Sequence, residues 1–433
     1  MTNPAPPPRA IARAAMTAAG IHPGRVDPLR RRMLWTLFAI SALGSTGYIA
    51  AGTVGTLVAA EIAGDAAFGG LPTAVSVLGT AVSATLLSGL MLRVGRRPGM
   101  LAGLGAGVTG AVIAIAAVVI SSIPILLLGT FLAGFANGGA QLGRYVAADL
   151  ALPARRASAI GFVVWGSTIG AVTGPNLIAP AGDVASSAGL PPLAGAYVVT
   201  AIFIGLAVLL AAVLLRPEPY ALADPSALEA RPTGTEAPAL SAVLRRPAVL
   251  VGLVALVAGQ VVMVLIMTMT PLHLRDHGHD LATIGIVLSA HLFGMFALSP
   301  LSGRLTDRFG SPRIIGAGLA TLAAAAILSA VAPPDGGVLL TLALFLLGYG
   351  WNLGFVAASA MLTHGLHIAE RTRVQGVADG LVWSSAAVAS LSSGIVVASA
   401  SYATLGLVAI ALLLLPVALL LFHRPGEAQR LPV

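Results

Sequence analysis

The sequence predicts an all-α polytopic membrane protein with twelve transmembrane helices in two pseudo-symmetric six-helix bundles. Two observations predict the class: 57% of the 433 residues are hydrophobic and only 9% are charged, whereas a soluble domain carries about 25% charged residues. A third observation predicts the duplication, because the basic stretch Gly303–Arg313 recurs in weaker form at Ser88–Arg97. The chain contains no cysteine, which excludes disulfides and thiolate chemistry, and we expect no cofactor.

Apolar runs set the order of the elements, since a helix needs about 20 apolar residues to cross a bilayer. In the first half, the expected spans fall at 33–60, 69–92, 99–120, 124–148, 157–180 and 193–215. In the second half they fall at 247–270, 281–303, 314–332, 338–362, 376–399 and 402–422. The expected domains are an N-terminal tail (1–32), an N-terminal bundle (33–216), a linker (217–246) with a short helix near Leu240–Arg246, a C-terminal bundle (247–422) and a tail (423–433).

The basic residues, all of them arginine, predict the orientation of the spans. They cluster in both tails, in the linker and in every second loop, and Arg275, next to Asp276, is the only one expected on the other side. Because basic loops stay in the cytoplasm, both termini are expected to be cytoplasmic in a multi-pass protein of the cell (inner) membrane. The net charge of +8 is thus a topology signal with some attraction to anionic lipid, and no nucleic-acid partner is expected.

The stretch Gly303–Arg313 reads Gly-Arg-Leu-Thr-Asp-Arg-Phe-Gly-Ser-Pro-Arg between two long apolar runs. Its charges place it at a membrane surface, and Gly310 allows the backbone to reverse. With its weaker copy, and with the match between Phe131–Gly134 and Phe345–Gly348, it resembles the helix 2–3 loop signature (motif A) and the duplicated halves of the major facilitator superfamily. The resemblance assigns a gating role to Gly303, Asp307, Arg308, Gly310, Arg313, Arg93, Gly95, Arg96 and Arg97.

The first copy departs from the family pattern, because Leu92 stands where the family has an aspartate that braces the start of helix 11. We hypothesise that the acid has moved across the interface, so that Asp379, at the start of helix 11, pairs with one of the arginines Arg93, Arg96 and Arg97. Asp149, at the end of helix 4, is expected to bind another of these arginines. Asp307 is expected to face the start of helix 5. The other interpretation of Asp379 is an acid that favours a helix N-terminus.

The expected helix 5 carries a second motif, with the spacing Gly-x8-Gly-x3-Gly-Pro at Gly161, Gly170, Gly174 and Pro175. Glycines on one helical face let a neighbouring helix approach closely, and a proline permits a bend. The motif resembles motif C of the antiporters of the same family, although the two glycines that normally follow are absent. The other interpretation is ordinary packing of small residues in a membrane helix.

A few polar and aromatic residues lie inside the expected spans and are candidates to line a substrate cavity or couple transport: Tyr48, Asn137, Gln141, Gln260, His291, Trp351 and Asn352. His291 is the deepest obvious titratable group, and it either relays protons or serves as a neutral hydrogen-bonding group between helices. The scarcity of charge in this set predicts a neutral or lipophilic substrate, because an anionic one would require cavity arginines.

Three histidines, His273, His277 and His279, cluster with Asp276 and Asp280 in an expected outer loop. Such a group could bind a divalent metal or act as an outer gate that responds to pH, but we interpret it as a solvated loop and predict no metal site.

The resemblance implies a secondary active transporter of a small molecule that works by alternating access as a monomer. Motif C favours efflux of neutral or lipophilic compounds coupled to protons. Two features oppose proton coupling. First, Thr130 stands where drug–proton antiporters of the family often carry an arginine early in helix 4, and Arg144, near the cytoplasmic end, does not replace it. Second, no carboxylate is expected near mid-membrane. The alternative is a metabolite uptake symporter or facilitator on the same fold. A polytopic membrane enzyme is a remote alternative, because the sequence contains no catalytic motif.

Overall fold

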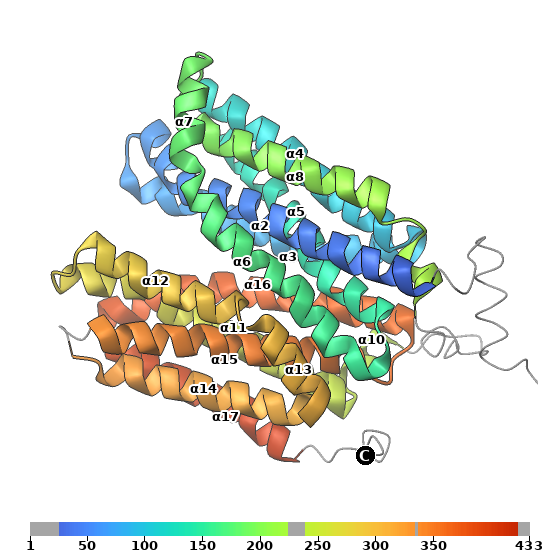
Figure 1. Ribbon diagram of the computed structural model, residues 1–433. Helices are drawn as coiled ribbons and strands as arrows, with labels where there is room; N and C mark the ends of the chain where they lie inside the picture. The colour runs from blue at the N-terminus through green and yellow to red at the C-terminus, as the bar shows by residue number, and fades with distance from the viewer. Residues whose placement is uncertain (1–25, 224–238, 334–336, 423–433) are drawn as a thin grey trace, which may run out of the picture. The chain divides into compact units, whose positions relative to one another are not determined.

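The computed structural model describes residues 26–223, 239–333 and 337–422, drawn in colour in Figure 1. Twelve of its helices are long and apolar enough to cross a membrane, which confirms the predicted class. Both tails and the linker segment 224–238 lie outside the described residues. The exception is residues 26–32 of the N-terminal tail, which belong to the first helix.

In the first half of the sequence the helices are α2 (Val26–Ala63), η2 (Ala66–Gly70), α3 (Leu71–Val94), α4 (Arg96–Val119), α5 (Ile123–Leu150), η3 (Pro153–Arg155), α6 (Arg156–Asn176), α7 (Ile178–Ser187), α8 (Ala194–Leu214) and η4 (Pro219–Leu222). In the second half they are α10 (Leu240–Leu244), α11 (Pro247–Asp276), α12 (Leu281–Phe296), α13 (Ser299–Phe309), α14 (Ser311–Val331), α15 (Gly337–Met361), α16 (Ile368–Ser399) and α17 (Tyr402–Phe422). The eighth span consists of α12 and α13, and α10 matches the short helix expected in the linker.

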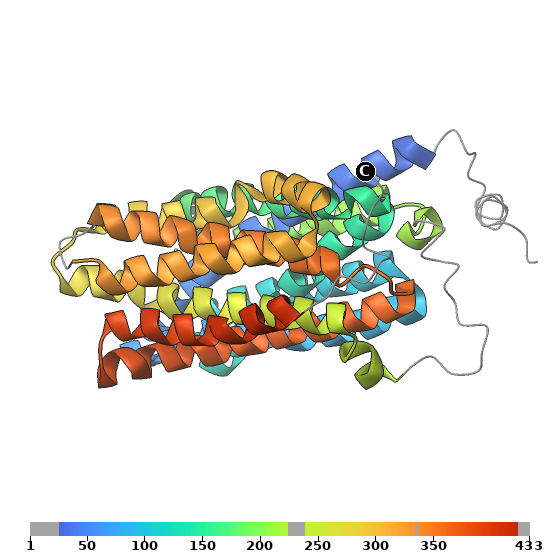
Figure 2. The ribbon, with the colours of Figure 1, turned by 90° about the horizontal axis from the view of Figure 1, so that it is seen from below.

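The helices pack into two compact units. Of the described residues, 26–223 and 363–387 form unit 1, and the remainder of 239–422 forms unit 2. The first part of α16 therefore packs with the helices of the first sequence half. Within each unit the long helices run lengthwise beside one another, as Figure 2 shows for α11, α14, α15 and α17. The predicted domain boundaries describe the duplication of the sequence, and they stay a prediction.

Each unit has a glycine at a crossing of two helices, where a larger side chain would meet the backbone of the neighbouring helix. In unit 1, a Cβ atom added at Gly134 of α5 would lie 2.3 Å from the carbonyl oxygen of Ser76 in α3. In unit 2, a Cβ atom added at Gly348 of α15 would lie 2.2 Å from the carbonyl oxygen of His291 in α12. Backbone thus packs on backbone at both crossings, and the predicted match of these helices is confirmed by equivalent packing.

The two basic turns also share a backbone conformation. Gly95 joins α3 to α4 with φ +105°, and Gly310 joins α13 to α14 with φ +86°. Both values lie in the left-handed region that only glycine adopts easily. The predicted reversal of the chain at Gly310, and its match to Gly95, are therefore confirmed.

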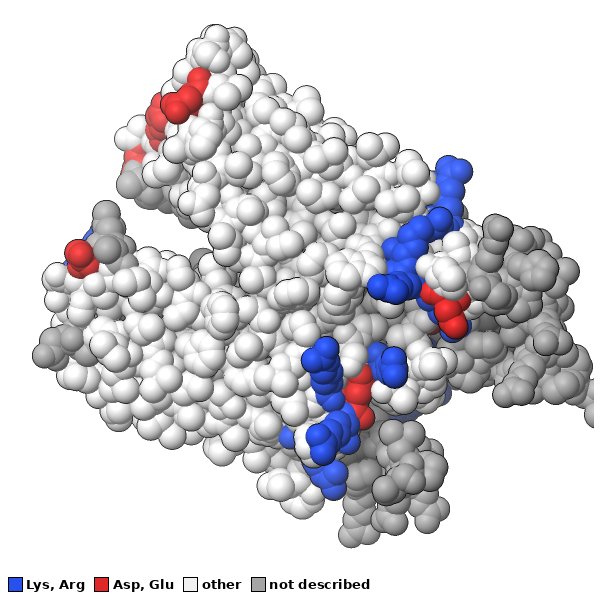
Figure 3. Space-filling model, viewed as in Figure 1, with Lys and Arg blue, Asp and Glu red and all other residues white. Residues whose placement is uncertain are grey.

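Charges separate along the helices of each unit. Figure 3 shows arginine side chains gathered at one end of unit 1, with acidic side chains among them, and acidic side chains at the other end. Exposed Arg31, Arg93 and Arg155 belong to the first group, and exposed Glu61 and Asp183 to the second. In unit 2, the turn that carries Arg304, Arg308 and Arg313 forms the corresponding basic end, which is also visible in Figure 3. We call these the arginine ends of the units.

Candidate functional site

A cluster of buried charges lies at the arginine end of unit 1. It contains three arginines and two aspartates, none of them more than 3% exposed: Arg96, Arg144, Arg371, Asp149 and Asp379. Charged side chains are almost never buried to this degree unless they are paired. The cluster therefore requires specific partners, and it is the candidate functional site of this unit.

The first pair of the cluster joins α4 to α5. The guanidinium of Arg96 donates two hydrogen bonds to Oδ2 of Asp149, from Nε at 3.1 Å and from Nη2 at 2.6 Å. Nη2 of Arg96 also donates to Oε1 of Gln375 in α16 at 3.0 Å. On the other side, Nη1 of Arg371 lies 3.8 Å from Oδ1 of Asp149. The predicted binding of Asp149 to an arginine of the first turn is confirmed.

The second pair joins α5 to α16. Nη2 of Arg144 donates to Oδ1 of Asp379 at 2.5 Å, and the Tyr145 hydroxyl donates to the same oxygen at 3.2 Å. The Arg144 guanidinium lies over the Tyr145 ring, 4.2 Å from its centroid, and Nη1 donates to the main-chain oxygen of Gln141 at 2.8 Å. Gln141, predicted as a cavity residue, thus orients Arg144.

The predicted pairing of Asp379 with Arg93, Arg96 or Arg97 is therefore wrong. Arg96 binds Asp149, Arg93 is exposed, and Arg97 donates to the main-chain oxygens of Ala211 and Ala212 at the end of α8. A signal for the correct partner was present in the sequence. Arg144 and Asp379 both lie in otherwise apolar runs, where an unpaired charge is costly.

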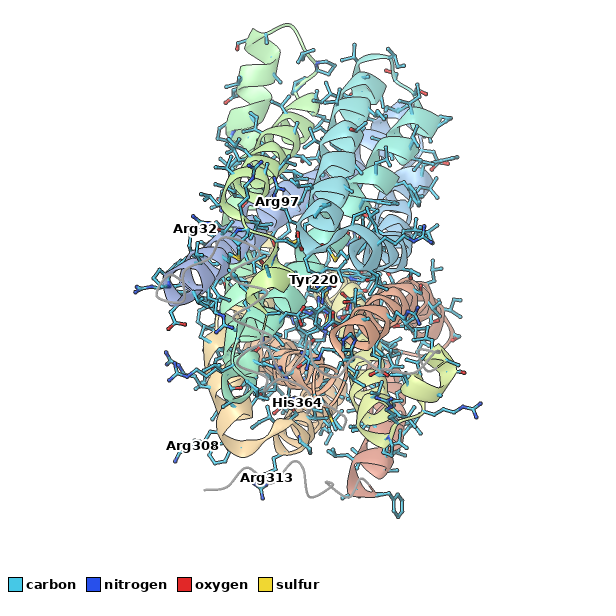
Figure 4. All side chains as sticks on the ribbon, turned by 90° about the vertical axis from the view of Figure 1, so that its right-hand side faces the viewer. Arg32, Arg97, Tyr220, Arg308, Arg313 and His364 are labelled. Atoms are coloured by element: carbon cyan, nitrogen blue, oxygen red, sulfur yellow. The ribbon has the colours of Figure 1, made fainter. Side chains whose placement is uncertain are left out.

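The segment Arg216–Ala223, which we call the strap, covers the first pair. The carboxylate of Glu218 accepts hydrogen bonds from the backbone N–H groups of Arg96 and Arg97, at the positive N-terminal end of α4. The Tyr220 ring lies 5.4 Å from the Arg96 guanidinium, and its hydroxyl lies 3.0 Å from Oγ1 of Thr372. Figure 4 shows Tyr220 and Arg97 at this end of unit 1. The strap could not be predicted from the sequence, because nothing in the composition of the linker distinguishes its first residues.

Glu218, which lies outside the membrane-spanning helices, is expected to make the stability of unit 1 depend on pH. Burial raises the pKa of its carboxyl above the ordinary 4.5 and outweighs the opposite effect of the Arg97 and Arg96 amides. Such a group contributes stability that is complete below pH 4.5 and is lost as the pH rises through the folded-state pKa. Thermal unfolding midpoints measured against pH should therefore have different slopes for wild type and Glu218→Gln, and parallel curves would contradict this prediction.

The other predicted cavity residues of unit 1 lie away from the cluster. Tyr48 of α2 is half-buried and interacts with the side chains of Ser76 and Thr80 in α3. Asn137 of α5 is buried and donates to Oγ1 of Thr80 at 3.4 Å. Both residues therefore contact α3, and their role toward a substrate stays a prediction.

In unit 2, the predicted cavity residues fall into two groups. Gln260 of α11 accepts a hydrogen bond from Nε1 of Trp351 in α15 at 2.8 Å. The Trp351 ring stacks on Phe355 with 4.4 Å between centroids, and both rings line a small apolar pocket. Asn352 is fully buried and ties α15 to the break between α12 and α13 through Met295 and Ser299 at 2.6 and 2.7 Å.

His291 is completely buried between α12 and α15. Its Nδ1 lies 3.0 Å from the main-chain oxygen of Leu344, and its Nε2 has no hydrogen-bond partner among the described residues. The ring therefore packs in the crossing that Gly348 keeps close, and a proton-relay role stays a prediction.

The basic turn of unit 2 carries the stronger copy of motif A. Gly303 is buried, Asp307 is half-buried, and Arg308 and Arg313 are exposed at the arginine end, where Figure 4 labels both arginines. The Arg308 guanidinium lies 5.2 Å from the centroid of the neighbouring Phe309 ring. The expected contact of Asp307 with the start of helix 5 stays a prediction.

The helix 5 motif lies on α6, which packs against α2. A Cβ atom at Gly170 would lie 2.4 Å from Cβ of Ser45, and one at Gly174 would lie 3.1 Å from the main-chain oxygen of Thr46. Gly161 is buried, and Pro175 is exposed one residue before α6 ends. The predicted close approach is confirmed at Gly170 and Gly174. The sequence pattern did not include Gly166, whose Cβ would lie 2.5 Å from the main-chain oxygen of Phe38.

The histidine cluster at the end of α11 is partly ordered by stacking. The His273 ring stacks on Tyr402 at 4.1 Å between centroids. The ring of His277, the residue that follows α11, lies 4.3 Å from the His273 ring between centroids. In the part of the chain that the structure describes, no group of three or more histidine, cysteine, aspartate or glutamate side chains is arranged to hold a metal ion.

Comparisons of the sequence and of the fold with known proteins all match the same family of transporters. A family profile, Major Facilitator Superfamily, matches residues 34–280 and 265–432. The uncharacterized MFS-type transporter YdeG of Bacillus subtilis is 36% identical over 399 residues, which cover 91% of this chain and 93% of that protein. The riboflavin transporter RfnT of Brucella anthropi is 32% identical over 404 residues, or 92% of this chain and 98% of that protein. The crystal structure of the human organic anion transporter MFSD10 (TETRAN) shares the fold, with a TM-score of 0.73 at 18% identity over 90% of this chain and 99% of that one.

Proposed function

Because the chain belongs to the major facilitator superfamily, we propose that it exports neutral or apolar small molecules by alternating access, driven by the proton gradient. The observation that carries the direction of transport is the contact between α6 and α2. The glycines Gly170 and Gly174 lie in this contact, in the pattern that resembles motif C of the family's antiporters. Hydroxyl pairs also cross it, Ser41 with Ser167 at 3.0 Å and Thr46 with Thr173 at 2.9 Å.

The charges support a neutral substrate. The residues expected to face the substrate are uncharged at neutral pH, among them Tyr48, Asn137, Gln260 and Trp351. The buried arginines Arg96 and Arg144 already bind aspartates, so neither is available as a bidentate partner for an anionic group. We place the arginine ends of both units at the cytoplasmic face of the cell membrane, since arginine-rich loops stay inside.

Export can be tested in inside-out membrane vesicles that contain the full chain. An imposed proton gradient, acidic inside, should drive uptake of lipophilic dyes and antibiotics by wild type, and Asp307→Asn should abolish it because the motif A carboxylate is lost. Asp183→Asn is the matched control, because this exposed acid lies on α7, outside the spans. Uptake no greater than in vesicles without the protein would contradict export.

A second candidate is uptake of a neutral vitamin, favoured by the 32% identity to the riboflavin transporter RfnT. Riboflavin combines a planar apolar ring with a hydroxylated chain, which suits a cavity of aromatic and amide side chains. Saturable entry of riboflavin into right-side-out vesicles, followed by its fluorescence, would favour this function. Entry equal to that in control vesicles would exclude it.

The pair of Arg144 and Asp379 joins a helix of each sequence half, so we assign it to the moving machinery. Arg144→Asp and Asp379→Arg alone should each abolish transport, because each leaves two like charges buried together. The double exchange restores opposite charges and should recover part of the activity in the same vesicle assay. A double variant as inactive as either single variant would contradict direct pairing, provided that all three reach the membrane in equal amounts.

A further inference from the structure

We propose that the face formed by α2 and α6 at the arginine end of unit 1 binds a phospholipid with an anionic headgroup. The phosphate lies against arginine side chains, and the acyl chains lie against a cluster of aromatic rings. Figure 1 shows the two helices side by side on one face of unit 1. Such a site is independent of the substrate and of its direction of transport, so it does not rest on the proposed function.

Four aromatic side chains form one cluster on this face. The Trp35 ring meets the Phe38 and Phe162 rings edge-on, at 5.6 and 4.9 Å between centroids. The Phe38 ring stacks on Phe162 at 5.0 Å and lies 5.4 Å from the Trp165 ring. The whole chain has four tryptophans and twelve phenylalanines, so two of each at one place is a marked concentration. Because every ring contacts at least two others, the cluster forms one preformed apolar surface.

This aromatic cluster lies at the surface of the molecule. Trp35 is 51% exposed and Trp165 is 39% exposed. Figure 3, seen from the same side as Figure 1, shows uncharged side chains along this face between the arginine end and the acidic end of unit 1. Tryptophan is enriched at the level where lipid headgroups meet the acyl chains. The rings are therefore suited to contact the first part of the acyl chains of a bound lipid.

The register of the two helices brings arginines to one level beside the cluster. Ser41 of α2 meets Ser167 of α6, 126 residues later, and the next hydroxyl pair repeats this offset to within one residue. The same offset places Arg31 of α2 beside residues 157–158, close to Arg155 at the start of α6. Both arginines are exposed. A headgroup on this face therefore meets a guanidinium from each side of the contact between α2 and α6.

The spacing between the arginines and the rings suits a phospholipid. Arg31 precedes Trp35 by one helical turn, so both side chains lie on the same face of α2, about 6 Å apart along the helix axis. Arg155 precedes Phe162 by two turns, about 10 Å along the axis. When the acyl chains cover the rings, the phosphate lies at the level of the guanidinium groups. These groups bind phosphate through paired N–H donors.

The charges of the site favour an anionic lipid. Arg30 and Arg32 of α2 donate to main-chain oxygens of the strap. By contrast, the side chains of Arg31 and Arg155 make no hydrogen bond or ion pair within residues 26–223, 239–333 and 337–422. Asp27, an exposed acid of α2, lies one more turn away from the rings. Phosphatidylglycerol brings no positive charge to the two guanidinium groups, whereas a zwitterionic headgroup would bring an ammonium group.

Fluorescence quenching by brominated lipids tests this site on the full chain in reconstituted vesicles. The double variant Trp351→Phe/Trp383→Phe serves as the reference protein, because its remaining tryptophans, Trp35 and Trp165, both belong to the cluster. Vesicles of phosphatidylcholine receive brominated phosphatidylglycerol or, in a parallel series, brominated phosphatidylcholine at the same mole fraction. We expect phosphatidylglycerol to quench more strongly at every low mole fraction.

Substitution of single arginines in the reference protein then locates the headgroup. Arg31→Gln and Arg155→Gln should each lower the preference for phosphatidylglycerol by about fivefold, the contribution of one arginine near an anionic membrane. Arg245→Gln is the matched control, because it removes an exposed arginine that follows α10 in unit 2. This control should leave the preference unchanged.

Three results would overturn the proposal. Equal quenching by the two lipids would show that the face accepts any lipid. Absence of quenching by either lipid would show that a protein, such as a second copy of the chain, covers the rings. Equal effects of Arg31→Gln and Arg245→Gln would reduce the preference to the overall surface charge. If the reference protein does not fold, the wild-type chain replaces it, and Trp35→Phe/Trp165→Phe supplies the signal of the other two tryptophans for subtraction.

Discussion

Replacement of Arg96 by methionine is expected to lower the free energy of unfolding by about 3–5 kcal/mol, the cost of leaving one member of a buried ion pair behind. Arg96 is completely buried and donates two hydrogen bonds to Asp149. Without it, the one ion-pair partner that the described residues leave to the carboxylate is Arg371, whose Nη1 lies 3.8 Å away. Thermal or denaturant unfolding in detergent micelles measures the loss.

Arg93→Met is the matched control for this substitution. Arg93 lies in the same turn, three residues earlier, and is exposed, so an unfolding change within about 0.5 kcal/mol is expected. A second variant, Arg96→Met/Asp149→Leu, removes both charges and should recover part of the loss, because no uncompensated carboxylate then remains. Equal effects of Arg96→Met and Arg93→Met would show that the buried pair contributes nothing.

Gly134→Ala is expected to destabilise unit 1 by about 3 kcal/mol, the upper part of the range for overpacking. The added Cβ atom would lie 2.3 Å from the Ser76 carbonyl oxygen and 2.7 Å from the Thr80 nitrogen. Both atoms belong to the backbone of α3, so only a separation of α3 from α5 can relieve the clash. Melting of the purified protein, followed by the loss of its monodisperse peak in size-exclusion chromatography, reports the change.

Gly139→Ala, on the same helix, provides the comparison. The nearest atom to a Cβ added at Gly139 would be Cα of Gly103 at 3.4 Å, which is an ordinary van der Waals contact. Because alanine favours a helix over glycine by about 1 kcal/mol, this variant should be as stable as wild type or slightly more so. If Gly139→Ala were as destabilising as Gly134→Ala, the loss of stability could not be attributed to a backbone clash at the crossing of α3 and α5.

The sequence predicted those features that depend on local composition. Apolar runs located all twelve spans, and glycine in a basic turn predicted the reversal at Gly310. Pairing within the cluster was harder to predict, because a long arginine side chain reaches several neighbours. The choice between Arg96 and Arg144 for Asp379 depends on how α16 is rotated against α4 and α5, which no local pattern encodes. The contact of Glu218 could not be predicted for the same reason, since its partners are the backbone amides of a turn that is distant in the sequence.

The second half of the chain supplies residues 363–387 to unit 1, and this has a consequence for biosynthesis. Arg144 is synthesised 235 residues before Asp379. The ribosome therefore completes α5 long before the counter-ion of Arg144 exists. During that interval the early bundle holds a guanidinium that water, lipid headgroups or a chaperone must solvate. In a nascent chain arrested in the linker, α16 would be missing, and Arg144 would lack the carboxylate that balances its charge in the folded protein.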